Sequence, residues 1–141
     1  MPMIELDNRT SLKIDENFLE KIASSLTTKE IELIITNNNE IQEINQQHRN
    51  INKPTDVLSF PYEDMPMSPL GSIVISADFV ESKALEFQHT NKDEFSLLFI
   101  HGLLHLLGYD HEIDNGEMRK EEKRVIETFC LPKSLIIRTE G

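Results

Sequence analysis

Residues 101–111 have the sequence HGLLHLLGYDH, which places three of the chain's five histidines in a segment that is otherwise mostly apolar. Side chains four residues apart on an α-helix project from the same face, so His101 and His105 can converge on one point. Gly108 can adopt the left-handed conformation that ends a helix, and a chain that reverses there can bring His111 back toward that point. The motif therefore predicts a helix whose end carries a three-histidine cluster.

The residues around these histidines also predict where the helix lies in the fold. We expect it to extend from Glu94 to Leu107, and its apolar side chains leave it hydrophobic nearly all round. A helix of that kind is buried inside a domain. The sequence thus predicts a central buried helix that carries His101 and His105.

The rest of the chain has the patterns of further strands and helices. Strands are expected at 31–36, 56–60 and 71–76, with an apolar N-terminal edge at 3–6 and with Pro61 closing the second strand. Four more segments have the capping residues and apolar spacing of helices, and they start near Asp15, at Asn38 or Asn39, at Ser76 or Asp78, and at Glu117. This order predicts an α+β fold with a small mixed β-sheet and helices surrounding the central one.

Length and composition limit the domain organisation. A chain of 141 residues without repeats or a Gly/Ser linker fits one domain over residues 1–141. The single cysteine, Cys130, excludes an internal disulfide and fits a reducing compartment. The first residues lack the pattern of a signal peptide, and no apolar run is long enough to span a bilayer. We therefore expect a cytoplasmic protein without a membrane partner.

Charge argues against general binding of polyanions. The chain has 25 acidic residues against 14 lysines and arginines, a formal net charge of −11, which repels nucleic acid and anionic membranes. The segment INQQHRNINKPT, residues 44–55, is an exception, because it contains His48, Arg49 and Lys53 and no acid. It can face an anionic substrate, or it can be a polar helix end and loop.

Three histidines with room for a water are the arrangement expected of a catalytic zinc site, whereas structural zinc sites usually have four protein ligands. Imidazole nitrogens suit zinc, copper, iron or nickel better than magnesium or calcium. The alternative is that each histidine is an ordinary core or surface residue. The combination of spacing and glycine favours the metal, and we predict one Zn²⁺ per chain.

The spacing of the three histidines coincides with that of the metzincin metallopeptidases, H-E-x-x-H-x-x-G-x-x-H. The general-base glutamate of that motif is replaced here by Gly102, which cannot transfer a proton. The sequence therefore shares a scaffold with these peptidases and lacks part of their catalytic machinery.

The histidine motif, together with RNINKPTDVLSFP at 49–61 and GSIVIS at 71–76, closely resembles the YbeY family of bacterial metal-dependent endoribonucleases. The resemblance implies a zincin-like α+β fold and one zinc ion held by His101, His105 and His111. It also implies single-strand-specific RNA cleavage in ribosomal RNA maturation, including the 3′ end of the small-subunit RNA, and in ribosome quality control. Partners implied are ribosomal RNA, small-subunit components and the Era GTPase. One departure is His48, where family members often have tyrosine.

The resemblance assigns an important role to Arg49. A planar guanidinium can hold a phosphodiester through two hydrogen bonds and stabilise the charge that grows in the transition state. Without the family, Arg49 would be interpreted as an exposed cation at a helix end. We expect residues 56–60 to form an edge strand that is one wall of the cleft, with Lys53 and Ser59 as substrate-binding groups.

The proton-transfer group remains unassigned, because Gly102 removes the familiar base. Asp110 and Glu112 flank His111 and are the nearest carboxylates in sequence. We favour Asp110 as a residue that orients a histidine ligand through a hydrogen bond. Two further function classes stay open: a ribosome assembly factor in which zinc serves only stability, and, disfavoured by Gly102, a metallopeptidase.

Overall fold

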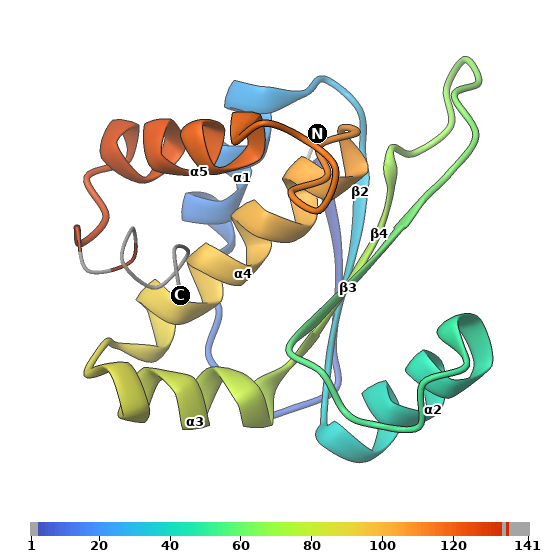
Figure 1. Ribbon diagram of the computed structural model, residues 1–141, viewed down its shortest axis with the longest axis vertical. Helices are drawn as coiled ribbons and strands as arrows, with labels where there is room; N and C mark the ends of the chain where they lie inside the picture. The colour runs from blue at the N-terminus through green and yellow to red at the C-terminus, as the bar shows by residue number, and fades with distance from the viewer. Residues whose placement is uncertain (1–2, 134, 136–141) are drawn as a thin grey trace.

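A four-stranded sheet divides the helices into two unequal sets (Figure 1). The computed structural model describes residues 3–133 and 135. The strands are β1 (Ile4–Asn8), β2 (Ile31–Thr36), β3 (Val57–Pro61) and β4 (Gly71–Ser76), in the order β1-β2-β4-β3. β1, β2 and β4 are parallel, whereas β3 is antiparallel to β4, which confirms the predicted mixed sheet.

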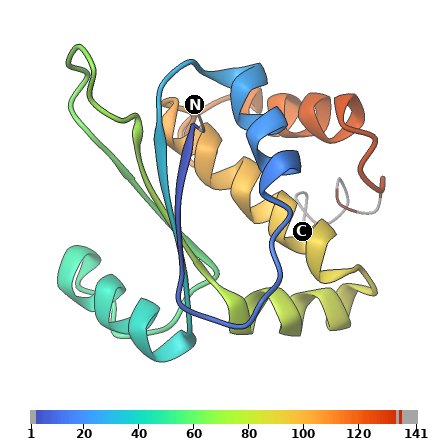
Figure 2. The ribbon, with the colours of Figure 1, turned by 180° about the vertical axis from the view of Figure 1, so that it is seen from behind.

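One face of the sheet is covered by four helices and the other by a single helix (Figures 1 and 2). The four are α1 (Glu16–Leu26), α3 (Ala77–Phe87), α4 (Asn91–Leu106) and α5 (Glu117–Thr128), and the single one is α2 (Asn38–Arg49). α4 has the central place predicted for it, with Phe99, Ile100, Leu103 and Leu104 fully buried. A smaller apolar cluster of Ile41, Leu58 and Val74 joins α2 to the sheet. No helix in the described residues is long and apolar enough to cross a membrane.

Capping side chains explain where the helices begin. Asp15 accepts a hydrogen bond from the amide of Phe18, as predicted, and Ser76 rather than Asp78 caps α3. Two predicted starts were wrong. The cap of α2 is Asn37, the first of three consecutive asparagines, and α4 begins after Thr90, three residues before the predicted Glu94. Both residues accept a hydrogen bond from an amide three positions on, which draws polar residues into the first helical turn.

β3 is the edge strand that the sequence predicted next to the histidines. It begins one residue later than expected and includes Pro61, which pairs in register with Gly71. Proline is tolerated there because one side of an edge strand has no neighbouring strand that needs its amide hydrogen. The outer side of β3 is therefore available to form a wall of a cleft.

The contact between α4 and the sheet is close at Gly102. A Cβ atom at this position would lie 3.0 Å from Cγ2 of Ile73, 3.2 Å from Cγ2 of Val57 and 3.2 Å from Oγ of Ser59. The hydroxyl of Ser59 donates a hydrogen bond to the carbonyl oxygen of Gly102 at 3.0 Å. The position occupied by the metzincin glutamate therefore faces the sheet in this chain.

We predict that Gly102→Ala destabilises the fold by up to about 2 kcal/mol, because the added methyl group overpacks this contact by about 1–3 kcal/mol and the helix preference of alanine offsets about 1 kcal/mol of it. Alanine favours a helix over glycine by about 1 kcal/mol, so a net loss reports the clash itself. The free energy of unfolding in urea measures it. Val57→Ala removes one of the crowded atoms, and the double variant should lose less than the two single variants together. A Gly102→Ala protein more stable than the wild type would contradict the prediction, because the clash would then be smaller than the helix preference of alanine.

Candidate metal centre and catalytic cleft

The three histidines of the sequence motif meet at the C-terminal end of α4. One ligand atom from each of His101, His105 and His111 lies within 4.8 Å of the others. Their ring centroids are 4.7 to 5.5 Å apart. The predicted cluster is therefore present, and His111 is its exposed member.

The turn after α4 brings His111 back to the helix. Gly108 has a φ of 101°, the left-handed conformation that its place after the helix predicted. Its amide donates to the carbonyl of His105 and the amide of Tyr109 donates to the carbonyl of Leu104, the two bonds of a Schellman motif. The sequence thus reverses the chain within a few residues of His105.

Two hydrogen bonds determine which ring nitrogens face the centre of the cluster. Nδ1 of His101 lies 2.8 Å from Oε1 of Glu122, and Nδ1 of His105 lies 3.0 Å from the carbonyl oxygen of Tyr109. A carboxylate and a carbonyl only accept, so each Nδ1 donates and each neutral ring keeps its lone pair on Nε2. The two Nε2 atoms face each other at 3.1 Å.

This arrangement fits a metal ion. Two lone pairs at 3.1 Å repel unless a cation lies between them. Zinc–nitrogen bonds at tetrahedral angles place two imidazole nitrogens about 3.3 Å apart, close to the separation seen here. Burial, and next the charge of His101, lower the pKa of His105, so its ring stays neutral and able to bind a metal to lower pH. The tautomers, the separation and the ligand type all agree with a three-histidine site.

Glu122 is the site residue that sequence reasoning missed. It comes from α5, is only 2% exposed, and its carboxylate orients His101. The predicted orienting residue, Asp110, instead accepts a hydrogen bond from the amide of Glu112 and makes none to His101 or His105 among the described contacts. Its charge only weakly raises the pKa of His105. An orienting role for Asp110 toward His111 stays a prediction.

A cleft of about 470 Å³ joins the histidines to the end of α2. Arg49 lines the same cleft as the three histidines, and in the described residues no carboxylate lies within ion-pair distance of this guanidinium. Ser59 also lines the cleft, although its hydroxyl proton is used in the bond to Gly102. Lys53 is exposed, does not line the cleft, and its carbonyl accepts from the side chain of Asn45. The structure thus unites Arg49 and Ser59 with the histidines, with Lys53 outside.

Carboxylates and aromatic rings complete the cleft. Asp56, Asp110 and Glu112 line it together with Tyr109. Asp56 accepts a hydrogen bond from the amide of Val57, so part of its carboxylate stabilises the start of β3. The lining thus contains three carboxylates, and Arg49 supplies the positive charge among them.

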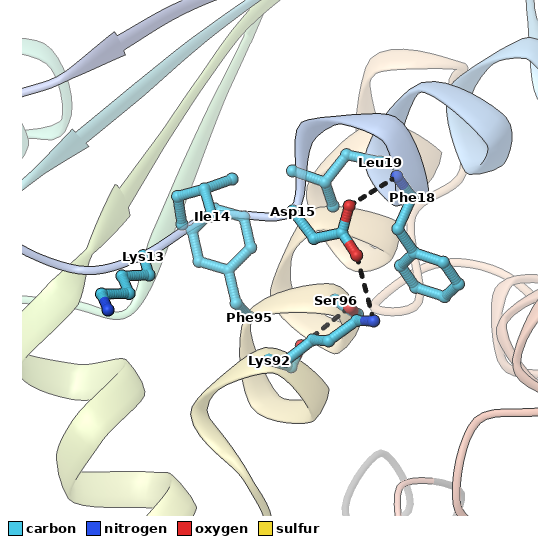
Figure 3. Close-up of a pocket in the computed structure, with 8 residues that line it drawn as sticks. All are labelled: Lys13, Ile14, Asp15, Phe18, Leu19, Lys92, Phe95 and Ser96. Carbon is cyan, nitrogen blue, oxygen red and sulfur yellow. Dashed lines mark hydrogen bonds and ion pairs between the residues drawn. The ribbon is translucent and has the colours of Figure 1, made fainter.

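A second cavity, of about 320 Å³, lies where α1 meets the start of α4 (Figure 3). Its charged pair is already satisfied, because Lys92 contacts Asp15 at 3.1 Å and lies 4.7 Å from the centroid of the Phe18 ring. That hydrogen bond with Lys92, and next the one from the amide of Phe18, lower the pKa of Asp15. Lys13 extends away from the pair in Figure 3. The cavity therefore belongs to the packing of α1 on α4.

A family match and named relatives from several bacteria give the same family. Residues 4–130 match the family described as Endoribonuclease YbeY. Proteins of that name include one from Sulfurimonas denitrificans, 67% identical over 139 residues that cover 99% of this chain and 100% of the relative. Another, from Campylobacter jejuni, is 57% identical over 126 residues, which cover 89% of this chain and 94% of the relative. The solution structure of a protein from Thermotoga maritima superimposes on this chain with a TM-score of 0.61 at 30% sequence identity. The match covers 89% of this chain and 88% of the Thermotoga chain.

We predict that Glu122→Ala lowers the affinity for Zn²⁺ by about 10-fold to 100-fold, because His101 loses the carboxylate that fixes its tautomer and orientation. Glu122→Gln should lose less, since its amide oxygen still accepts the hydrogen bond but has no negative charge. Competition with a chromophoric chelator measures the affinity. Glu121→Gln is the matched control, because the neighbouring carboxylate pairs with Arg124 at the surface. Unchanged affinity in a folded Glu122→Ala protein would contradict the role.

Proposed function

Since the chain belongs to the Endoribonuclease YbeY family and is a hydrolase acting on RNA, we propose that it is a zinc-dependent, single-strand-specific endoribonuclease of ribosomal RNA maturation. Its substrates include the 3′ end of the small-subunit RNA, and it serves ribosome quality control. The observation that supports the proposal most is one cleft lined by both Arg49 and the three-histidine cluster.

His101, His105 and His111 hold the metal, and Glu122 and the Tyr109 carbonyl keep two of these rings in the binding tautomer. A zinc ion held by these rings would supply Lewis acidity and would lower the pKa of a bound water toward neutrality. The exposed position of His111 leaves the cluster accessible from the cleft. A phosphodiester can therefore approach the site from the side that Arg49 occupies.

Arg49 binds the scissile phosphate. Its guanidinium can donate two parallel hydrogen bonds to phosphate oxygens and stabilises them most when negative charge grows in the transition state. The end of α2 holds it in place: Asn50 adopts a left-handed conformation with a φ of 58°, and Asn45 donates to the carbonyl of Lys53 at 2.9 Å. The turn at Asn50 and the hydrogen bond between Asn45 and Lys53 together hold the chain around Arg49.

The outer edge of β3 is the wall of the cleft along which an extended strand of RNA binds. Backbone donors and acceptors at a free edge can pair with an extended ligand. Ser59 offers its oxygen as an acceptor there, and Lys53 lies beyond Arg49, where it can contact a flanking phosphate. Asp110 steadies the loop that carries His111 through its bond with the amide of Glu112.

The family resemblance implies partners on the ribosome, and the charge of the chain agrees with a need for them. With a net charge of −11, the protein is repelled by most of an RNA surface, so affinity must be concentrated in the cleft and in protein contacts. We propose small-subunit components and the Era GTPase as these partners, and the cytoplasm as the compartment where they meet.

The assembly-factor alternative keeps the metal site and removes the chemistry. It predicts that a folded Arg49→Ala variant rescues ribosomal RNA processing in cells that lack the native protein, and that chelation of zinc unfolds the chain. The peptidase alternative predicts cleavage of a denatured protein without cleavage of RNA. Two observations disfavour the peptidase. Gly102 stands where the metzincin motif has its general-base glutamate, and a side chain at this position would point toward the sheet.

We predict one zinc per chain in the purified protein, measured by metal analysis, and its loss in the His101→Ala, His105→Ala double variant. One remaining imidazole cannot hold the ion tightly, so zinc retained at a full equivalent would contradict the site.

The metal-loaded protein should cleave a single-stranded RNA and leave a duplex of the same sequence intact, and a chelator should abolish the cleavage until zinc is restored.

We predict that Arg49→Lys slows single-turnover cleavage by about ten-fold to a thousand-fold while RNA binding is partly kept, because lysine retains the charge but loses the two-pronged contact. Arg49→Ala should lose both. Lys53→Ala is the matched control, since it removes a positive charge outside the cleft and should affect binding alone. Zinc content and melting temperature should not change, and equal cleavage rates in wild type and both Arg49 variants would exclude Arg49 from the mechanism.

A further inference from the structure

Two aromatic rings in tilted contact lie next to residues that line the cleft. His48 is exposed in the last turn of α2, and its ring packs on Phe60 of β3 with centroids 5.0 Å apart and 55° between the planes. Each ring directly precedes a residue that lines the cleft, since His48 is followed by Arg49 and Phe60 by Pro61. The ring pair therefore adjoins the cleft without being part of its wall.

The pair lies on the α2 side of β3. Successive side chains of a strand point to opposite faces, so Phe60 shares a face with Leu58, whereas Ser59 and Pro61 face α4 and the cleft. Arg49 lines the cleft and His48 directly precedes it on α2, so a single strand of RNA that leaves the cleft over the edge of β3 can reach the ring pair.

The surroundings of His48 suit a nucleotide. Phe60 packs against the apolar cluster of Ile41, Leu58 and Val74, so the ring beneath His48 is held by the core. The chain from 44 to 55 contains no carboxylate, in a protein of net charge −11. A base and its phosphate are therefore not repelled by the segment that presents His48.

We propose that His48, supported by Phe60, is a stacking platform for one unpaired base beside the phosphodiester that is cleaved. This inference rests on the proposed endoribonuclease function. An aromatic face accepts any nucleobase, so the platform confers little sequence preference. The faces of a base inside a duplex are already stacked on its neighbours, so the platform selects single-stranded RNA.

The test uses the zinc-loaded protein and a short single-stranded RNA in which one nucleotide at a time, on either side of the cleaved bond, is made abasic. In single-turnover cleavage, one abasic position should raise the half-saturating concentration of wild type by about 5-fold to 100-fold, the worth of one stacked base. His48→Ala should show the same weakening with the intact RNA and none in addition with that abasic RNA. The maximal rate should change little, because Arg49 and the metal ligands remain.

Two further variants separate stacking from packing. His48→Leu still covers Phe60 but has no aromatic face, and should bind RNA as weakly as His48→Ala; His48→Phe should bind as tightly as wild type. Gln47→Ala, at the exposed position before, is the control for the helix surface. A 2-aminopurine at the sensitive position should lose fluorescence on binding wild type and not His48→Leu.

The outcomes separate the two claims. If the abasic and His48→Ala penalties simply add, or if His48→Leu binds like wild type, the platform is wrong and the nuclease stands. If the loaded wild type cleaves no RNA of the series, the proposed function itself fails.

Discussion

The absence of a side chain at Gly102 allows α4 to lie so near β3 and β4 that even a Cβ atom there would lie only 3.0–3.2 Å from its neighbours. The bond from Ser59 to the carbonyl of Gly102 then fixes the helix along the strand. Because His101 and His105 flank this contact on the same helix, their positions relative to the edge of the sheet follow from it. Arg49, at the end of α2, lines the same cleft as these histidines. A shift of α4 would thus separate the two halves of the cleft.

Electrostatics tie the metal site to the stability of the fold. Glu122 is buried, and a buried carboxylate is costly unless it is paired and hydrogen-bonded. Its partner is His101, whose opposite nitrogen faces the metal position. A bound cation therefore also stabilises the link between α4 and α5. The segment before Asp56, residues 44–55, contains no carboxylate. It therefore does not repel RNA, although the chain as a whole is acidic.

The parts of the site that the sequence could predict are those encoded locally. The spacing of His101 and His105 and the glycine at 108 are enough to predict the cluster, because helix periodicity and the left-handed turn act over a few residues. Glu122 lies far along the chain, in a run of charged residues that suggests an exposed face. Its signal was its place on the inward stripe of α5, in line with Met118, Val125 and Ile126, where an acid requires a partner. Thr90 was missed because a polar stretch can be either a loop or the first turn of a helix.

The free edge of β3 has a consequence for how these molecules behave in concentrated solution. Unpaired backbone groups of an edge strand attract strands of other chains, and many proteins protect such edges. Here any chain that added a strand beside β3 would cover this wall of the cleft and exclude the substrate. Pro61, which has no amide hydrogen to offer, shortens the stretch open to such pairing. Resistance to aggregation and access for substrate are therefore set by the same five residues.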